Sequence, residues 1–530
     1  MSKHLKNISL VSGLTMASRV LGLVRESLTA AVFGTSELLS AFVTGITLPN
    51  IFRRLLAEGG LTAAFIPALN DELEARQRPG AFALVNQVTS WLFAVTVGLV
   101  VVAMVLLSQD GAIRAIGRLG GAEPATVVRW LDGARFAVML FPYLILVSLA
   151  AAFSAALQTL HRFFEPALSP IWLNLSIIGL LLAAMHWAHG DPATQILWLG
   201  GGWLAGGFLQ MIVPAAALVG EGWRPRPDFR LSPPVRGMLR LMAPTVFSSS
   251  IYLFNMSVSR LVGLSLNDAA VAVLNFSQRL MELPIGVFAI AVSTVVFPLI
   301  SRYAAAGDHE NLAQSYRKGM RLILLINVPA AVGLAVLAVP IIRLILQHGQ
   351  FTAEATAMMR PVLIANAVGL PFLAFVSLAL RAFYAQKDTM TPLRAAGLSF
   401  LVNLVLSLAL MGPLSTTGLA VASTVAVVVQ AVYLQWHLAR RHGGLAFHHL
   451  AGDLGKVAVA SAAMGALVAG GWWMRLRMLP ARSAADVIVL AVLIVGGVLV
   501  YGLLAWVLRV EARDELATVL AKLRRREKSS

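Results

Sequence analysis

The 530-residue chain contains no cysteine, and only 13% of its residues are charged. Without cysteine, neither disulfides nor thiolate metal sites can contribute. An ordinary soluble domain is about 25% charged, so the low charge argues against a soluble protein. The ten histidines show no HExxH or comparable ligand spacing, and no P-loop, nucleotide fingerprint or catalytic-triad spacing occurs. We therefore expect no catalytic residue, no metal, no cofactor and no ATP motor within the chain.

Apolar residues make up 58% of the chain. Apolar runs of about 18 residues or more recur from end to end, and each is long enough to cross ~30 Å of hydrocarbon as a helix. The pattern predicts an all-α polytopic membrane protein with about fourteen transmembrane helices. Their predicted ranges are 7–33, 37–57, 82–107, 134–158, 167–187, 194–219, 238–264, 268–299, 320–346, 357–383, 392–411, 416–438, 455–474 and 485–508.

The distribution of the 42 Lys and Arg residues predicts the topology. If both termini are cytoplasmic, most of these residues fall in cytoplasmic loops and tails, as the positive-inside rule requires. The net charge of +17 and the basic tail "KLRRREKSS" then follow from topology and anionic lipid. We expect no nucleic-acid partner.

An internal repeat divides the chain. "PYLILVSLA" (142–150) matches "PFLAFVSLA" (371–379), and "LNL" (173–175) matches "VNL" (402–404) at the same offset. The repeat predicts a lobe of six helices at 1–222 and a second at 223–445, related by a pseudo-two-fold axis along the membrane normal, as in transporters that rock two halves about a midplane site. Residues 446–508 form two further helices, and 509–530 form a basic tail.

The stretch "SRVLGLVRES" (18–27) places charge inside the first predicted span. Arginine at membrane depth costs at least ~2.5 kcal/mol and persists where it faces a wet cavity or a partner. Arg19 and Glu26 share a helix face, whereas Arg25 points elsewhere, and Gly22 lets another group approach the backbone. Either the charges are internal ion pairs that brace helices, or surplus arginine lines a cavity for a phosphate group, which guanidinium binds bidentately.

Two further spans carry charge at depth. In the eighth, Arg279 and Glu282 are three residues apart, which is close enough to pair. In "LPNIFRRLLAEGG" (48–60), Pro49 predicts a bend that is either an ordinary proline kink or a gating hinge. Arg53 would then project near the cavity, and Glu58 could cap or pair locally.

Other polar residues at membrane depth have simpler explanations. Asn174 and Asn403 are repeat-related and fit interhelical hydrogen bonding better than ligand contact. Arg135, Arg260 and Arg343 fall near helix ends, where long side chains reach the interface. We expect no functional role for these three arginines.

Several of these motifs together resemble the MviN/MurJ family of lipid II flippases, within the multidrug/oligosaccharidyl-lipid/polysaccharide exporter superfamily. The resemblance covers about residues 7–425 and includes "SRVLGLVRE", "LPNIFRRLLAEGGLTAAFIP", "PALSPIWLNLSIIG", "RLMELPIGVFAIAVSTVVFP", "QFTAEAT" and "RAFYAQKDTMTP". It implies a two-lobed flippase for undecaprenyl-pyrophosphate-linked peptidoglycan precursor in the bacterial cytoplasmic (inner) membrane. It also implies a cavity lined by Arg19, Arg25, Arg53 and Arg279, with the last two helices forming a groove for the lipid tail.

The chain departs from the family pattern at acidic positions. Ser40 stands where many members have Asp, and Gln278 replaces an acid before the eighth-helix arginine. Ser259 replaces an Asp that is implicated in sodium binding in some relatives, which weakens any inference of sodium coupling. Glu26 replaces a common Asp.

These observations favour a lipid II flippase that works by alternating access, with lipid II and membrane lipids as partners. The alternatives are a flippase for another polyprenyl-linked glycan and a drug exporter of the same superfamily. An exporter of cationic drugs should carry carboxylates in its cavity, whereas arginine predominates at depth here. This argues against a drug exporter. A different class is a membrane scaffold that recruits cell-wall synthesis enzymes, for which the central arginines would be dispensable.

Overall fold

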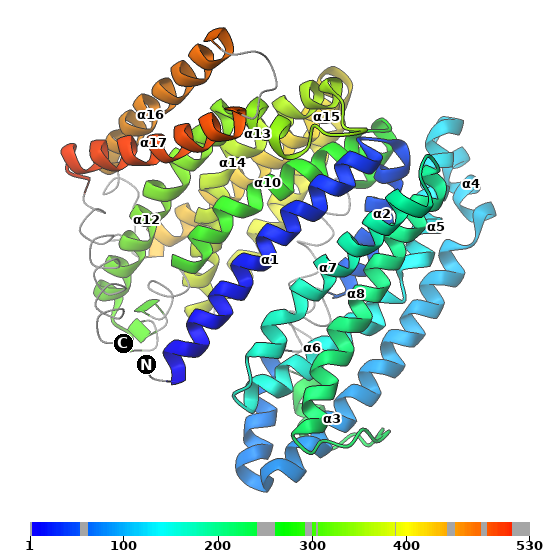
Figure 1. Ribbon diagram of the computed structural model, residues 1–530. Helices are drawn as coiled ribbons and strands as arrows, with labels where there is room; N and C mark the ends of the chain where they lie inside the picture. Colours follow the sequence, from blue (N-terminus) through cyan, green and yellow to red (C-terminus); the bar gives the residue numbers. More distant parts are fainter. Residues whose placement is uncertain are drawn as a thin grey trace. The chain divides into compact units, whose positions relative to one another are not determined.

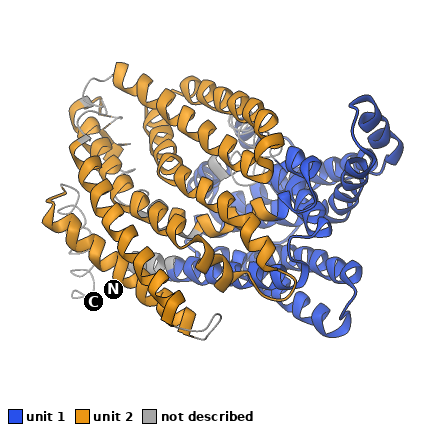
Figure 2. Ribbon diagram, turned by 90° about the horizontal axis from the view of Figure 1, so that it is seen from above, with its two compact units in different colours: residues 1–272 blue, residues 273–530 orange. Residues whose placement is uncertain are grey.

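The computed structural model describes residues 3–53, 62–240, 260–291, 299–300, 302–303, 306–386, 388–441, 451–478 and 485–510. These parts of the chain are predominantly helical and contain no β-strand (Figure 1), which confirms the predicted all-α class. The chain divides into two compact units, 1–272 and 273–530 (Figure 2). The predicted division into two lobes, a helix pair and a tail stays a prediction.

The helices α1 to α8 lie in the first unit. They are α1 (Lys3–Phe33), α2 (Glu37–Arg53), α3 (Thr62–Leu107), α4 (Asp110–Leu119), α5 (Pro124–Leu140), α6 (Tyr143–Thr159), α7 (Phe164–Trp187) and α8 (Pro192–Gly220). The second unit contains α12 (His309–Val336), α13 (Ala338–Ile345), α14 (Ala353–Ala385), α15 (Met390–Arg441), α16 (Ala451–Met478) and α17 (Ala485–Val507), and α10 (Ala270–Ala291) crosses the division.

Most predicted spans coincide with a described helix or part of one, whereas 134–158 crosses the junction of α5 and α6 and 320–346 crosses that of α12 and α13. Most of 238–264 and the end of 268–299 lie outside the described residues. α3 and α15 are each two helices joined at a break, because Gln77 (φ 55°) and Ser415 (φ 50°) are not helical. The 52 residues of α15 would measure about 78 Å as one straight helix, far more than the hydrocarbon thickness. α15 therefore supplies the two spans predicted at 392–411 and 416–438.

Within the described ranges, eight helices are long and apolar enough to cross a membrane, or nine if the bent pair α5–α6 is one span. This number is lower than the predicted one for physical reasons. α2 has only 17 residues, charges interrupt α1, and α15 counts once although it holds two spans. α5 and α6 meet at 43°, at the Phe141–Pro142 junction.

Glycine sets the close packing of α7 on α8. A Cβ atom added to Gly202 would lie 2.9 Å from the Cα of Ile177, and one added to Gly206 would lie 2.9 Å from the Cα of Leu173. Small residues four apart let membrane helices approach in this way. The contact fixes α7, which also packs against α1, and so determines what faces the charged stretch of α1.

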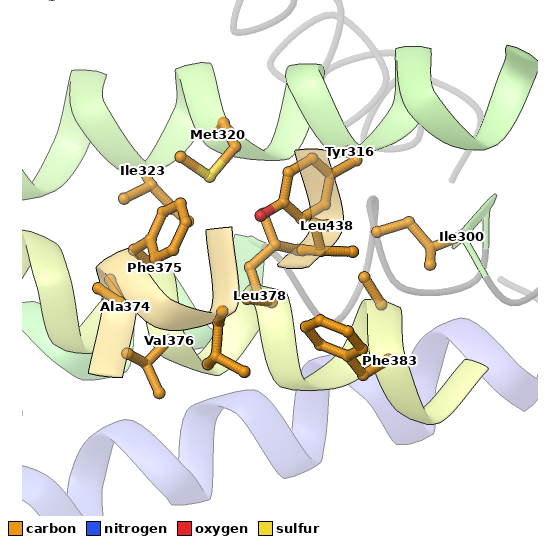
Figure 3. Packing of buried hydrophobic residues seen from close by; sticks show 14 of the residues in the cluster. Ile300, Tyr316, Met320, Ile323, Ala374, Phe375, Val376, Leu378, Phe383 and Leu438 are labelled. Atoms are coloured by element: carbon orange, nitrogen blue, oxygen red, sulfur yellow. The ribbon is translucent and has the colours of Figure 1, made fainter. Parts of the chain in front are cut away.

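The second unit has its main core between α12, α14 and α15. Figure 3 shows Tyr316 and Met320 of α12 beside Phe375 of α14 and Leu438 of α15. The pairing of α12 with α14 parallels the pairing of α3 with α6 in the first unit, as the repeat between α6 and α14 requires. Burial of this apolar surface stabilises the bundle independently of the charged residues.

An extended segment, residues 222–232, follows α8 and binds along α3; we call it the strap. Trp223 donates to Asn86 Oδ1 (2.8 Å), and Trp91 donates to the carbonyl of Phe229 (3.1 Å). The Asp228 carboxylate accepts a hydrogen bond from Gln87 (3.1 Å) and two from Arg230 (2.8 and 2.9 Å). The bonds from Arg230, helped by that from Gln87, hold the pKa of the Asp228 carboxyl far below its ordinary value.

The last two helices pack on α12. Tyr501 of α17 donates to the carbonyl of Leu325 (2.8 Å), and Arg321 of α12 pairs with Asp453 of α16 (2.9 Å). The remaining surface of α17 is strongly apolar and exposed, with Val492, Val498 and Leu503 among its uncovered side chains. Such a face matches a hydrocarbon environment.

Candidate functional site

The helix α1 places the charged stretch against α7 and α8. Ser18, Gly22 and Arg25 follow one another at intervals of four and three residues, so they form a single stripe along the helix. That stripe faces Asn174 of α7, because Asn174 bonds to both Ser18 and Arg25. The charges of the sequence motif therefore lie at an interface between helices.

Arg25 is buried, with 8% of its surface exposed. Its Nη1 donates to Asn174 Oδ1 (3.0 Å) and its Nη2 to Glu26 Oε1 (2.5 Å). The guanidinium carbon lies 5.6 Å from the ring centroid of Trp203 on α8, within the range of a cation–π contact. A carboxylate, an amide and an aromatic ring thus compensate the burial of this charge.

Asn174 uses both ends of its side-chain amide. While Oδ1 accepts from Arg25, Nδ2 donates to the carbonyl of Ser18 (3.0 Å) and approaches its hydroxyl (3.4 Å). A Cβ atom at Gly22 would lie 3.9 Å from Nδ2, so the group that approaches the backbone at Gly22 is this amide. Asn174 is 5% exposed and bridges two turns of α1.

The other predicted arginines lie in different surroundings. Arg19 is half-buried, one residue after Ser18 on α1. Arg53, also half-buried, ends α2 and donates from Nε to Asn50 Oδ1 (3.1 Å). Arg279 on α10 pairs with Glu282 at 2.7 Å, as the three-residue spacing predicts.

The structure brings together only part of the predicted set. Gly22, Arg25, Glu26 and Asn174 form one group, whereas Arg279 and Glu282 belong to the second unit. Pro49 is buried within α2, and Asn403 is buried in α15, where it accepts from Ser407 at 3.5 Å. The predicted Glu58 and Ser259 lie outside the described residues.

Arg260, which is expected to reach the membrane interface from a helix end, is half-buried and donates from Nη1 to the hydroxyl of Thr47 and, at 3.5 Å, to the carbonyl of Val43, both on α2. Its reach to the interface stays a prediction. The hydroxyl and the carbonyl compensate the loss of water around the half-buried guanidinium. Arg343, by contrast, is exposed at the end of α13.

Arg129 is a buried charge that the sequence did not indicate. Arg129 of α5 is buried and pairs with Asp268 at 2.6 Å, while it also donates to Thr126 (3.0 Å). Ser40 of α2 donates to the carbonyl of Asp268 (2.5 Å) and accepts from the N–H of Ala272 (3.3 Å). The Ser40 hydroxyl therefore ties α2 to the start of α10.

No sequence signal identified Arg129, because a basic residue in a predicted loop is normally exposed. The position of Asp268 at the predicted start of a span is the one sequence feature that indicates an acidic partner near a helix end. Among the described residues, no group of three or more His, Asp or Glu side chains is placed to hold a metal ion.

Many long apolar helices, with buried charges between helices of the first unit, define a polytopic membrane protein. The family model described as "Lipid II flippase MurJ" matches residues 29–481. The chain belongs to this family.

Curated relatives agree with the family match. The "Probable lipid II flippase MurJ" of Rhizobium meliloti is 35% identical over 433 residues, which cover 81% of this chain and 79% of the relative. That of Rhizobium tropici is 33% identical, covering 87% of this chain and 86% of the relative. Both are similar along most of their length.

Solved structures share the fold. "Lipid II flippase MurJ, inward closed conformation" has a TM-score of 0.74 at 24% identity and covers 94% of this chain and 98% of that one. An inward-facing multidrug resistance MATE transporter of the MOP superfamily has a TM-score of 0.62 at 15% identity, covering 80% of this chain and 95% of that one. At these identities the likeness concerns the fold alone.

Proposed function

We propose that this chain moves lipid II from the inner to the outer leaflet of the bacterial cytoplasmic membrane by alternating access. Family membership supports the activity. The observation that carries the proposal is the buried guanidinium of Arg25, which is held by Asn174, Glu26 and Trp203. A protein that only needed a stable bundle would not require a cation at this depth, because apolar replacements of buried ion pairs are often neutral or stabilising.

The chemistry of the substrate fits arginine. A pyrophosphate cannot cross hydrocarbon without its water unless other groups replace the hydration, and a guanidinium binds phosphate oxygens through two parallel hydrogen bonds. In this proposal Arg19, Arg25, Arg53 and Arg279 contact the pyrophosphate and first sugars at different stages of transport. Pro49 supplies a hinge in α2, and Glu26 and Glu282 balance the charge of the arginines between substrates.

The lipid tail can remain in the membrane during transport. The exposed apolar surface of α17 supports a groove for the prenyl chain at residues 446–508. The lysine and arginine distribution supports cytoplasmic termini. The two predicted lobes, 1–222 and 223–445, would rock about the arginines, and cell-wall synthesis enzymes are candidate partners.

The test replaces Arg19, Arg25 or Arg279 by Ala in cells depleted of their own lipid II flippase. We expect export, scored by externally exposed lipid II, to fall to background while membrane abundance stays normal. Arg25→Lys should restore only part of the activity, because an ammonium lacks the bidentate fork. Arg343→Ala, which removes an exposed arginine, is the matched control and should export normally.

Three outcomes decide between the hypotheses. Normal growth and export in all three alanine variants would refute the phosphate site and favour the scaffold. Loss of the protein from the membrane would show that the arginines brace the bundle. If the chain restores growth to cells depleted of a flippase for another polyprenyl-linked glycan, but gives no externally exposed lipid II, the alternative substrate is favoured.

A further inference from the structure

Arg25 is held by side chains from three sides, and one of them, Asn174, also bonds to the backbone of α1. Glu26 is its neighbour in sequence, and Trp203 supplies a ring face. Asn174 bonds to the guanidinium with Oδ1 and to the carbonyl of Ser18 with Nδ2, at 3.0 Å in each case. The amide therefore links the Arg25 side chain to the turn that carries Arg19.

The orientation of an amide is fixed by such opposed bonds. Oδ1 can only accept and Nδ2 can only donate, so a rotated amide would place a donor against Arg25 and an acceptor against the Ser18 carbonyl. Both contacts would then be repulsive. The guanidinium and the backbone of α1 consequently hold Asn174 in one orientation, and Asn174 in turn holds them.

Neighbouring residues fix this arrangement. A Cβ atom at Gly22, between the two bonded positions, would be in ordinary contact with Nδ2 at 3.9 Å, so the amide packs directly on α1 there. Close packing on α8 through Gly202 and Gly206 fixes the backbone of α7 on either side of Asn174. The position of the amide is therefore set by rigid helices, which is what precise placement of a functional side chain needs.

We infer that Asn174 is a positioning residue for the substrate, which holds the Arg25 guanidinium in one orientation relative to the Ser18 turn of α1 so that Arg25 presents fixed donors to the pyrophosphate. This inference rests on the proposed function. The bonds to Asn174 and Glu26 use one donor on each terminal nitrogen of Arg25, and guanidinium has five donors in a fixed plane. Asn174 thereby determines which donors of Arg25 face the substrate.

The test is a double-mutant cycle on the full-length protein. Binding of a short-chain, water-soluble lipid II analogue is measured with Asn174→Leu, Arg25→Ala and the double variant. We expect Asn174→Leu to weaken binding about tenfold, the equivalent of about 1.4 kcal/mol, at normal membrane abundance. In the Arg25→Ala background the same change should have no further effect, because residues that act through one another are not additive.

Gln210 provides the matched control. It is another buried amide of the first unit, and it bonds α8 to α7 through the carbonyl of Ser169 (3.1 Å) and accepts from Tyr143 (3.3 Å). Gln210→Leu removes a comparable interhelical amide that is linked to Arg25 only indirectly, through the edge-on contact of Tyr143 with Trp203 (5.6 Å between ring centroids). Because that ring contact does not need the amide, we expect the affinity for the analogue to stay unchanged.

The outcomes separate this inference from the proposed function. Wild-type affinity in Asn174→Leu, an equal loss in Gln210→Leu, or an undiminished loss in the Arg25→Ala background would each overturn the positioning role. Wild-type affinity in Arg25→Ala would instead overturn the proposed substrate contact. If Asn174→Leu does not accumulate, Asn174→Ala, which removes the amide without adding methyl groups, must give the same tenfold loss.

Discussion

Arg25 and Arg260 are arginines of the first unit whose guanidinium groups bond to a neighbouring helix. Arg25 has a carboxylate beside it, Glu26 at 2.5 Å, so its charge is balanced locally. Arg260 donates to a hydroxyl and a carbonyl of α2. At Arg25, a phosphate of the substrate can take the place of the Glu26 carboxylate. The bonds of Arg260, in contrast, tie the helix that carries it to α2.

Arg260→Ala should therefore destabilise the protein. The Thr47 hydroxyl keeps its bond to the Val43 carbonyl (2.6 Å), so no buried hydroxyl is orphaned and the cost is that of the lost charged hydrogen bond, about 1.5–3 kcal/mol, reduced by the relief of desolvation. We expect a lower thermal midpoint in detergent for Arg260→Ala and an unchanged one for Arg343→Ala. Equal midpoints would support the expectation that Arg260 reaches the interface.

At the scale of elements, the spans were predictable because hydropathy is a local property. Each apolar run must satisfy its backbone as a helix in lipid, so the sequence alone places α7, α8 and α17 to within a few residues. The i, i+3 pair Arg279–Glu282 was predictable for the same reason. The partners of Arg25 and Arg129 were not, since Asn174 and Asp268 are 149 and 139 residues distant in the chain.

The strap depends on Asp228, and its removal should loosen the segment. Asp228→Asn loses the charged bonds to Arg230, so we expect faster tryptic cleavage after Arg230; Arg224 and Arg226 each precede proline and resist trypsin. If the strap is cytoplasmic, cleavage requires inside-out vesicles. Asp191→Asn, which alters a loop carboxylate that caps α8, is the control and should leave the strap protected.

The pH dependence of the strap follows from the depressed pKa of Asp228. A carboxyl whose pKa is lowered on folding stabilises the folded form above its unfolded pKa, about 3.9, and this stabilisation is lost as pH falls through the lower, folded pKa. The strap should thus stay protected throughout the neutral and mildly acidic range. Cleavage after Arg230 that accelerates in the wild type between neutral and mildly acidic pH would contradict this assignment.

At the scale of the whole molecule, the charge that crosses the membrane limits the possible energy sources. Glu26 and Glu282 balance Arg25 and Arg279, so the anionic pyrophosphate is the charge that must move outward. A membrane potential that is negative inside favours this direction by ~2.3 kcal/mol per charge per 100 mV. Ser40 uses its hydroxyl to bond to Asp268 and Ala272 and offers no carboxylate to a cation.

We therefore expect export to depend on the membrane potential and little on sodium. Collapsing the potential with valinomycin and matched potassium should stop the appearance of external lipid II, because the anionic pyrophosphate loses the force that favours its outward movement. Replacing sodium with choline should leave the rate nearly unchanged, since neither Ser40 nor Ser259 supplies the carboxylate that a sodium site prefers. Nigericin, which dissipates the pH gradient and spares the potential, separates the two components of the proton-motive force. Export that persists without a potential and stops without sodium would show that this chain couples to a cation through residues other than these two positions.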